Sequence, residues 1–239
     1  MYSYQVSSFH VGALTQVVQC FETINQYVFL EIESSSLRIQ CVDHDDTTVM
    51  NYVVPVVSTG ERCMRSMVYI RCDQMLQFIQ CVHGDVYIDF ESDNTWSARD
   101  ITGHSCLWST GRHKPPPPTT TDGLSECVVC IPSVDFLLYV QHITICESYV
   151  RVSSRGTNDL TMESEGELVS IQIQNRPEVH EDRQHVVMKC TFKYIRAILS
   201  ILQKLEKLDI YITDKTCLYM KVPLGTGALS VMLKDKTRY

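Results

Sequence analysis

The stretch Ser109-Thr-Gly-Arg-His-Lys-Pro-Pro-Pro-Pro-Thr-Thr-Thr-Asp-Gly-Leu-Ser125 interrupts a chain that otherwise alternates apolar runs with polar turns. Its four consecutive prolines favour extended polyproline II backbone, which forms no ladder hydrogen bonds. The stretch therefore predicts a linker at residues 110–125. It separates two parts of similar length, residues 1–109 and 126–239, and so points to an internal duplication.

The first part contains two helix patterns among strand patterns. Val11, Leu14, Val18 and Phe21 recur at helical spacing and predict an amphipathic helix over residues 9–24. A second, shorter helix is predicted over residues 72–82. Strands are predicted at residues 27–32, 37–42, 47–54, 63–70 and 86–90, with two more before residue 108.

The second part repeats this order. A strand is predicted at 127–131, and Pro132-Ser133 then opens a helix to about residue 146, with Ser133 as its N-cap. A second helix is predicted over residues 191–205. Strands are predicted at 149–154, 160–163, 168–174, 186–190, 209–213, 217–222 and 229–233. The repeat indicates an α+β protein with two similar domains, each with two helices covering a curved antiparallel sheet.

The composition is that of a folded globular protein, with 44% hydrophobic and 21% charged residues. We expect no membrane-spanning or secretory segment, because no apolar run reaches about 18 residues. The 11 cysteines lie mostly inside apolar runs, which indicates reduced core thiols. A net charge of −7 argues against a protein that is basic throughout, although the local field decides nucleic-acid binding.

Five segments carry a resemblance to the DNA sliding-clamp family, in particular to proliferating cell nuclear antigen, its trimeric clamp. They are Leu37-Arg-Ile-Gln-Cys-Val-Asp43, Met75-Leu-Gln-Phe-Ile-Gln-Cys81, Val128-Val-Cys-Ile-Pro-Ser-Val-Asp-Phe136, Phe192-Lys-Tyr-Ile195, and Leu218-Tyr-Met-Lys-Val222 followed by Leu229-Ser-Val-Met-Leu233.

The resemblance implies a DNA polymerase processivity factor that acts in replication and repair. Three identical chains would close head to tail into a ring around duplex DNA, without reading its sequence. The ring would hold a polymerase and other clamp-binding peptides, and a clamp loader would be a further partner. The expected location is the nucleus, or a viral replication compartment. The resemblance implies no enzymatic activity, no cofactor and no membrane partner.

The family lines its hole with lysine and arginine, whose counterion release favours binding to DNA. In this chain the corresponding positions include Thr15, Glu22 and Leu138, and only the last helix offers positive charge. We therefore expect a weaker and less salt-sensitive grip on DNA than in a typical clamp. The residues expected to face DNA are Lys193, Arg196, Lys204, Gln16, Gln77, Gln80 and Gln141.

The resemblance also implies a groove for partner peptides and two sheet edges that join subunits. Cys217 stands where the family has proline, which leaves the peptide preference open. The groove residues implied are Val42, Asp43, His44, Asp46, Thr47, Leu124, Cys217, Met232, Leu233 and Lys234. The interface residues implied are Ser105, Cys106, Leu107 and Trp108 on one edge, and Leu168, Ser170, Ile171 and Ile173 on the other.

Other functions are open to the same residues. A checkpoint-ring subunit, or a viral replication or late-transcription accessory protein, would keep the fold with a weak grip on DNA. A metal- or carboxylate-dependent enzyme built around Asp43 to Asp46 and nearby histidines is a further alternative, but consecutive acidic residues more often form a solvated turn. Cys127 and Cys130 have the spacing of a zinc pair, yet they lie in a strand pattern with no second pair, so we expect no metal site.

Overall fold

The computed structural model describes residues 3–6, 8–33, 35–58, 66–92, 95–109, 127–143, 149–154, 159–164, 170–174, 186–213 and 217–236. These residues fall into two compact units. The first unit draws on Met1–Val42, Met50–Pro118 and Pro223–Leu229, and the second on Asp43–Val49, Thr119–Val222 and Ser230–Tyr239. The predicted linker at 110–125 lies outside the described residues, so the boundary between the domains stays a prediction.

The first half of the chain forms two antiparallel strand groups and two helices. The groups run β4-β3-β2-β6 and β5-β1-β7-β8-β9. The elements are β1 (Ser3–Val6), α1 (Ser8–Glu22), β2 (Tyr27–Glu33), β3 (Ser36–Val42), β4 (Thr48–Pro55), β5 (Val57–Ser58), β6 (Ser66–Arg71), α2 (Cys72–Cys81), β7 (Val86–Ser92), β8 (Thr95–Asp100) and β9 (Ser105–Ser109).

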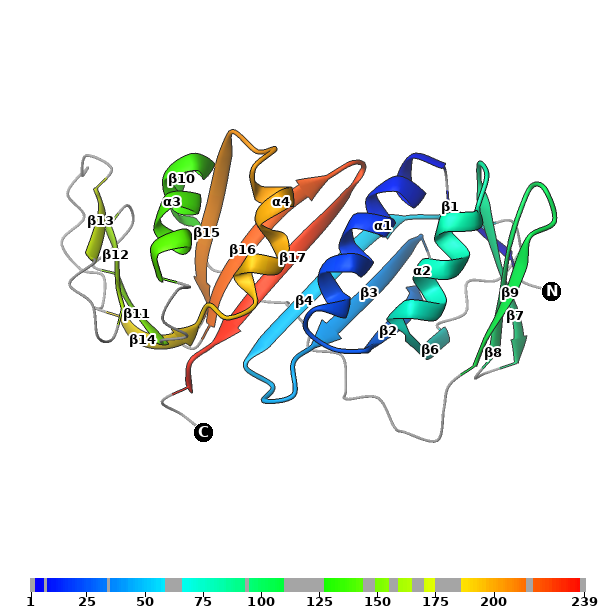
Figure 1. The fold of residues 1–239 in the computed structure, drawn as a ribbon, viewed down its shortest axis with the longest axis horizontal. Helices are drawn as coiled ribbons and strands as arrows, with labels where there is room; N and C mark the ends of the chain where they lie inside the picture. Colours follow the sequence, from blue (N-terminus) through cyan, green and yellow to red (C-terminus); the bar gives the residue numbers. More distant parts are fainter. Residues whose placement is uncertain are drawn as a thin grey trace. The chain divides into compact units, whose positions relative to one another are not determined.

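Helices α1 and α2 pack against each other and cover the same side of their strands (Figure 1). The apolar stripe of α1 enters the core, where Val17, Val18 and Phe21 are fully buried. From α2, Met75 and Ile79 are buried, as their shared helical face predicts. The outer faces of both helices are left to solvent.

The second half has the same design. Its groups run β13-β12-β11-β14 and β10-β15-β16-β17, and α3 packs on β10 and beside the last helix. The elements are β10 (Cys127–Pro132), α3 (Ser133–Ile143), β11 (Tyr149–Ser154), β12 (Asp159–Ser164), β13 (Ser170–Gln174), β14 (Val186–Thr191), the 3₁₀ helix η1 (Ile195–Ile198), α4 (Leu199–Leu202), β15 (Lys207–Thr213), β16 (Cys217–Leu224) and β17 (Gly227–Lys234).

The two halves match strand for strand. The order β4-β3-β2-β6 has its counterpart in β13-β12-β11-β14, and β1-β7-β8-β9 has its counterpart in β10-β15-β16-β17. Among the described residues, only β5 lacks a counterpart. The predicted α+β class with two helices on an antiparallel sheet in each half is confirmed.

Local details differ from the sequence prediction at three places. The helix predicted over 191–205 is shorter, and its first turn is 3₁₀: the buried Ile195, Ile198 and Ile201 are spaced by three residues, which matches the 3₁₀ period. Ser133 does not cap α3 with its side chain, because its Oγ is buried without a hydrogen-bond partner. The short strands β1 and β5 were not predicted.

The buried cysteines behave as predicted. Cys20, Cys41, Cys72 and Cys190 are buried thiols that are not joined in disulfides. Burial raises the pKa of the Cys20 thiol to about 11 and that of Cys190 to about 12, so both remain thiols near neutral pH.

Within the described ranges, no helix combines the length and apolarity needed to cross a membrane.

Candidate nucleic-acid and partner surfaces

The outer faces of α1 and α2 are polar but lack positive charge. Gln77 and Gln80 are exposed on α2, and Gln16 is half-buried on α1 beside Thr15. The Thr15 hydroxyl donates to the Val11 carbonyl of its own helix at 3.2 Å. Neither helix contains lysine or arginine. Glutamine can hydrogen-bond a phosphate oxygen, but it releases no counterions.

The corresponding surface of the second unit is divided between an apolar helix and a basic one. On α3, Val134 is 60% and Leu138 is 53% exposed, and Gln141 follows on the same helical face. Lys193, Arg196 and Lys204 are exposed in and around η1 and α4. The Lys193 ammonium lies 5.2 Å from the centre of the Tyr194 ring, which can steady this cation. The positive charge of the helical faces is therefore concentrated here.

The turn at residues 43–47 and the end of β17 form one hydrogen-bonded surface within the second unit. The Lys234 backbone N–H donates to the Thr47 carbonyl at 2.8 Å, and its Nζ lies 2.8 Å from Asp46 Oδ1. Asp46 adopts a left-handed φ of 54°, which aspartate tolerates better than most residues. His44 and Asp46 are exposed, whereas Asp43 and Thr47 are buried. The structure thus brings together predicted groove residues far apart in sequence.

Other predicted groove residues are placed differently. Met232 is 5% exposed and Leu233 is fully buried, so these side chains support the surface from below. Cys217 is half-buried at the start of β16. Val42 belongs to the first unit, where its carbonyl accepts a hydrogen bond from Asn25 Nδ2 at 2.9 Å. Leu124 lies outside the described residues.

Sequence reasoning missed two residues that shape this surface. Asp235 is 3% exposed and accepts a hydrogen bond from the Lys189 backbone N–H at 3.1 Å, which ties the chain after β17 to β14. Lys236 donates to the Tyr149 hydroxyl. The sequence signal for these residues was the charged pair Asp235-Lys236 just after the last predicted strand. Their partners could not be predicted, because Lys189 and Tyr149 lie 46 and 87 residues away along the chain.

The predicted subunit edges are terminal strands in the described sheets. β9 pairs only with β8, and β13 pairs only with β12. On β9, Ser105 is exposed and Leu107 is 65% exposed. Trp108 points inward and is only 3% exposed, and Cys106 is half-buried. Ser170, Ile171 and Ile173 lie on β13, and Leu168 lies outside the described residues. Both strands present an outer row of backbone groups that a further strand can pair with.

No protein-family model matches this chain, and no curated protein sequence matches it. Among solved structures, the chain is similar to one in the crystal structure of the PCNA2–PCNA3 complex from Sulfolobus tokodaii. The TM-score is 0.67 at 12% sequence identity, and the match covers 98% of this chain and 99% of the other. The chain therefore has the sliding-clamp fold over nearly its whole length.

Proposed function

We propose that this chain is the subunit of a DNA sliding clamp that tethers a polymerase and other replication and repair proteins to duplex DNA. The observation that carries the proposal is the strand-for-strand duplication, with two helices on one side of the sheet in each half. The similarity to PCNA chains over 98% of the length supports it.

A clamp of this kind works as a scaffold rather than as an enzyme. Encirclement converts repeated encounters between polymerase and template into an effectively intramolecular one, which raises the local concentration without new contacts to the bases. A clamp loader is the partner that would open such a ring. The place of action would be the nucleus, or a viral replication compartment.

Self-association would use β9 of one copy and β13 of the next. By the duplication, β9 and β13 are the counterparts of β17 and β4. Within the first unit the start of β17 packs closely on β4: a Cβ on Gly227 would lie 2.6 Å from the Val53 carbonyl oxygen. Within the second unit, Lys234 N donates to the carbonyl of Thr47, just before β4. The same pairing between copies would cover both free edges, and three copies would close a ring.

Leu107 provides the test of this edge. The variant Leu107→Glu places a charge on the exposed face of β9. We expect the mass in solution to fall from that of a trimer, three times 27.4 kDa, to that of a single chain. Ile101→Glu is the matched control, because Ile101 is 66% exposed but lies in the turn before β9. A wild-type chain that is monomeric at all concentrations would exclude the homotrimer.

The grip on DNA would rest on Lys193, Arg196 and Lys204. Because only these three cations per subunit lie on the described helical faces, we expect the DNA affinity to depend less on salt than in a clamp with lysine and arginine on all four helices. The absence of lysine and arginine from α1, α2 and α3 also favours a second candidate function, a checkpoint-ring subunit or a viral replication or late-transcription accessory protein. A stable mixed trimer with other clamp chains would favour that candidate.

Partner peptides with apolar anchors would bind beside the surface formed by residues 43–47 and the end of β17. The exposed side chains His44 and Asp46 and the half-buried Lys234 would set the peptide preference. The charge reversals Asp46→Lys and Lys234→Glu should each change the affinity for such peptides, measured by fluorescence anisotropy on a synthetic panel.

The decisive experiment is retention on DNA. The purified chain is loaded on nicked circular DNA and separated by gel filtration, before and after the circle is linearised. Retention on circles that disappears on linear DNA supports encirclement. Equal retention on both forms would contradict it.

A further inference from the structure

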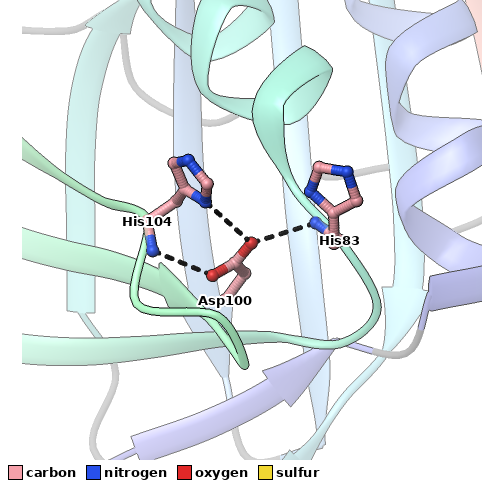
Figure 2. Close-up of side chains that lie close together, drawn as sticks. All are labelled: His83, Asp100 and His104. Carbon is pink, nitrogen blue, oxygen red and sulfur yellow. Dashed lines mark hydrogen bonds and ion pairs between the residues drawn. The ribbon is translucent and has the colours of Figure 1, made fainter.

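Two turns of the first unit meet where α2 ends and where β8 passes into β9. His83 lies in the first turn, and Asp100 and His104 flank the second (Figure 2). Both histidines are exposed, and their rings are stacked with centroids 6.2 Å apart. A ring nitrogen of each histidine and a carboxylate oxygen of Asp100 lie within 4.8 Å of one another. Among the described residues this is the one cluster of three potential metal ligands.

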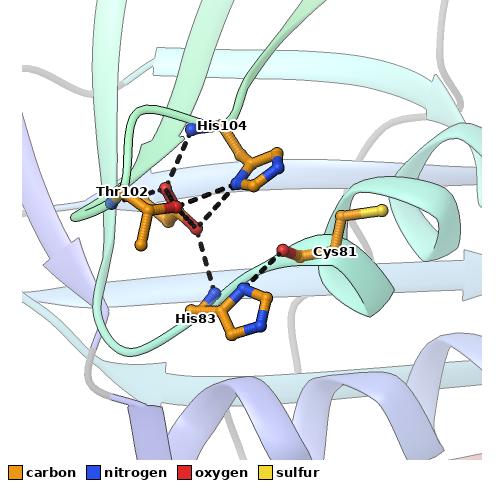
Figure 3. Close-up of polar contacts among 5 residues, drawn as sticks. Cys81, His83, Thr102 and His104 are labelled. Carbon is orange, nitrogen blue, oxygen red and sulfur yellow. Dashed lines mark hydrogen bonds and ion pairs between the residues drawn. The ribbon is translucent and has the colours of Figure 1, made fainter.

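The Asp100 carboxylate is held rigidly at the base of the cluster. It is 4% exposed. Its Oδ1 accepts from the backbone N–H groups of Thr102 at 2.8 Å and His104 at 2.9 Å, and its Oδ2 accepts from the His83 N–H at 3.0 Å (Figures 2 and 3). One carboxylate thus joins both turns. The Thr102 hydroxyl also lies 2.9 Å from Oδ2 and 2.8 Å from Oδ1. Because this hydroxyl has one hydrogen, it can donate to Oδ1 and leave an Oδ2 lone pair for a metal ion.

The two imidazoles are oriented by neighbouring oxygens. His83 Nδ1 lies 3.0 Å from the Cys81 carbonyl oxygen, and His104 Nδ1 lies 2.9 Å from Thr102 Oγ1 and 3.5 Å from Asp100 Oδ2. A neutral imidazole binds a metal ion through the lone pair of one ring nitrogen, while the N–H on its other nitrogen donates to a carbonyl, a carboxylate or water. Both rings are exposed and can rotate. Rotation is needed to bring the ligand atoms, which lie within 4.8 Å of one another, to the separation of about 3.4 Å found around a tetrahedral Zn²⁺.

We propose that His83, His104 and Asp100 form a surface site for a divalent transition metal, with Zn²⁺ as the preferred ion and water in the fourth position. Two imidazoles and one carboxylate are a ligand set that Zn²⁺ accepts. The ion would lock the turn between β8 and β9 onto the end of α2. This site departs from the sequence expectation of no metal, because Asp100 and His104 follow His83 by 17 and 21 residues, which is no known motif spacing. The turn dipeptides His83-Gly84 and Gly103-His104 were the available signal.

The test is titration of the metal-free full chain with Zn²⁺ by calorimetry. We expect one ion per chain, and at least a tenfold loss of affinity in His83→Ala and in His104→Ala. The control His44→Ala removes an exposed histidine elsewhere and should bind like the wild type. Co²⁺ separates this site from the cysteines, since nitrogen and oxygen ligation gives visible d–d bands without thiolate charge-transfer absorption.

A thermal readout gives an independent check. Zn²⁺ should raise the Tm of the wild type and of His44→Ala, but not that of the double variant His83→Ala/His104→Ala, because ligands that bind only the folded state stabilise it. The proposal is overturned if the wild type binds no Zn²⁺ at millimolar concentration, or if the double variant binds it as tightly. Thiolate absorption as the only Co²⁺ signal would also overturn it.

Discussion

The Asp43 carboxylate accepts hydrogen bonds from both the backbone N–H and the hydroxyl of Thr47, each at 2.7 Å. It also accepts from the Thr48 backbone N–H at 2.9 Å, and it is 5% exposed. These bonds close the turn that carries His44 and Asp46 toward solvent. With three donors already bound, the carboxylate holds this loop in shape, which gives the residue a structural role.

Replacing Asp43 tests that role. Asp43→Ala leaves the buried donors of Thr47 and Thr48 unpaired, and we expect a loss of about 1–3 kcal/mol in the free energy of unfolding, measured in urea. Asp45→Ala is the matched control, because Asp45 is exposed, and it should stay within about 0.5 kcal/mol of the wild type. Equal stability of Asp43→Ala and wild type would show that the hydrogen bonds do not form in solution.

Removing the basic charge of the last helix should weaken DNA binding. For the double variant Lys193→Gln/Arg196→Gln we expect a lower affinity for duplex DNA and a shallower salt dependence. The slope of log K against log salt falls by about 0.9 for each lost phosphate contact. The measurement is fluorescence anisotropy across a salt series.

Lys221→Gln is the control for this pair. Lys221 is exposed on β16, on the strand face opposite the buried Met220 and Val222. We expect an unchanged slope. If Lys221→Gln lowers the slope as much as the double variant, the DNA surface lies elsewhere.

A matched pair of glycines tests the packing at the start of β17. A Cβ at Gly227 would lie 2.6 Å from the Val53 carbonyl oxygen and 2.7 Å from Val54 Cγ1. Gly227→Ala should therefore destabilise the chain by about 1–3 kcal/mol through overpacking. Gly12 lies exposed in α1 with nothing within 4 Å of the added carbon. Gly12→Ala should stabilise by about 0.5–1 kcal/mol, because alanine favours the helix. If urea unfolding showed the same change in stability for both variants, the close packing at Gly227 would be contradicted.

Asp100 should contribute a pH dependence to stability. Burial alone would raise the pKa of its carboxyl, but hydrogen bonds from His83, Thr102 and His104 outweigh burial and lower the pKa below its usual range. A carboxyl whose pKa is lower in the folded state stabilises the fold above its unfolded pKa of about 3.9, and this stabilisation is lost as the pH falls through the folded pKa.

The variant Asp100→Asn reveals this contribution. In EDTA, we expect the urea midpoint of the wild type to fall more steeply than that of Asp100→Asn as the pH drops below about 4. Asp45→Asn, at an exposed position, should follow the wild type. Parallel curves for wild type and Asp100→Asn would mean that the hydrogen bonds to this carboxylate do not survive in solution.

The helices and most strands followed from local patterns. The stripe of Val11, Leu14, Val18 and Phe21 predicted a helix over 9–24, and α1 spans Ser8–Glu22. The strand predicted at 149–154 coincides with β11. Periodicity is set by neighbours along the chain, so burial of one face is visible in the sequence. The repeated order of these elements predicted a duplicated α+β fold, and the resemblance of five segments to the sliding-clamp family predicted the clamp fold.

The sequence by itself thus determined which segments become helices and strands and that they occur twice. Only the tertiary structure decided which side chains meet. It placed Met232 and Leu233 inside, turned the start of the last helix into a 3₁₀ turn, and joined Asp46 to Lys234 across 188 residues. It also brought His83 to Asp100 and His104. These long-range contacts depend on how strands pair and turns close. They cannot be predicted from the sequence, because the separation of the two residues along the chain follows no period.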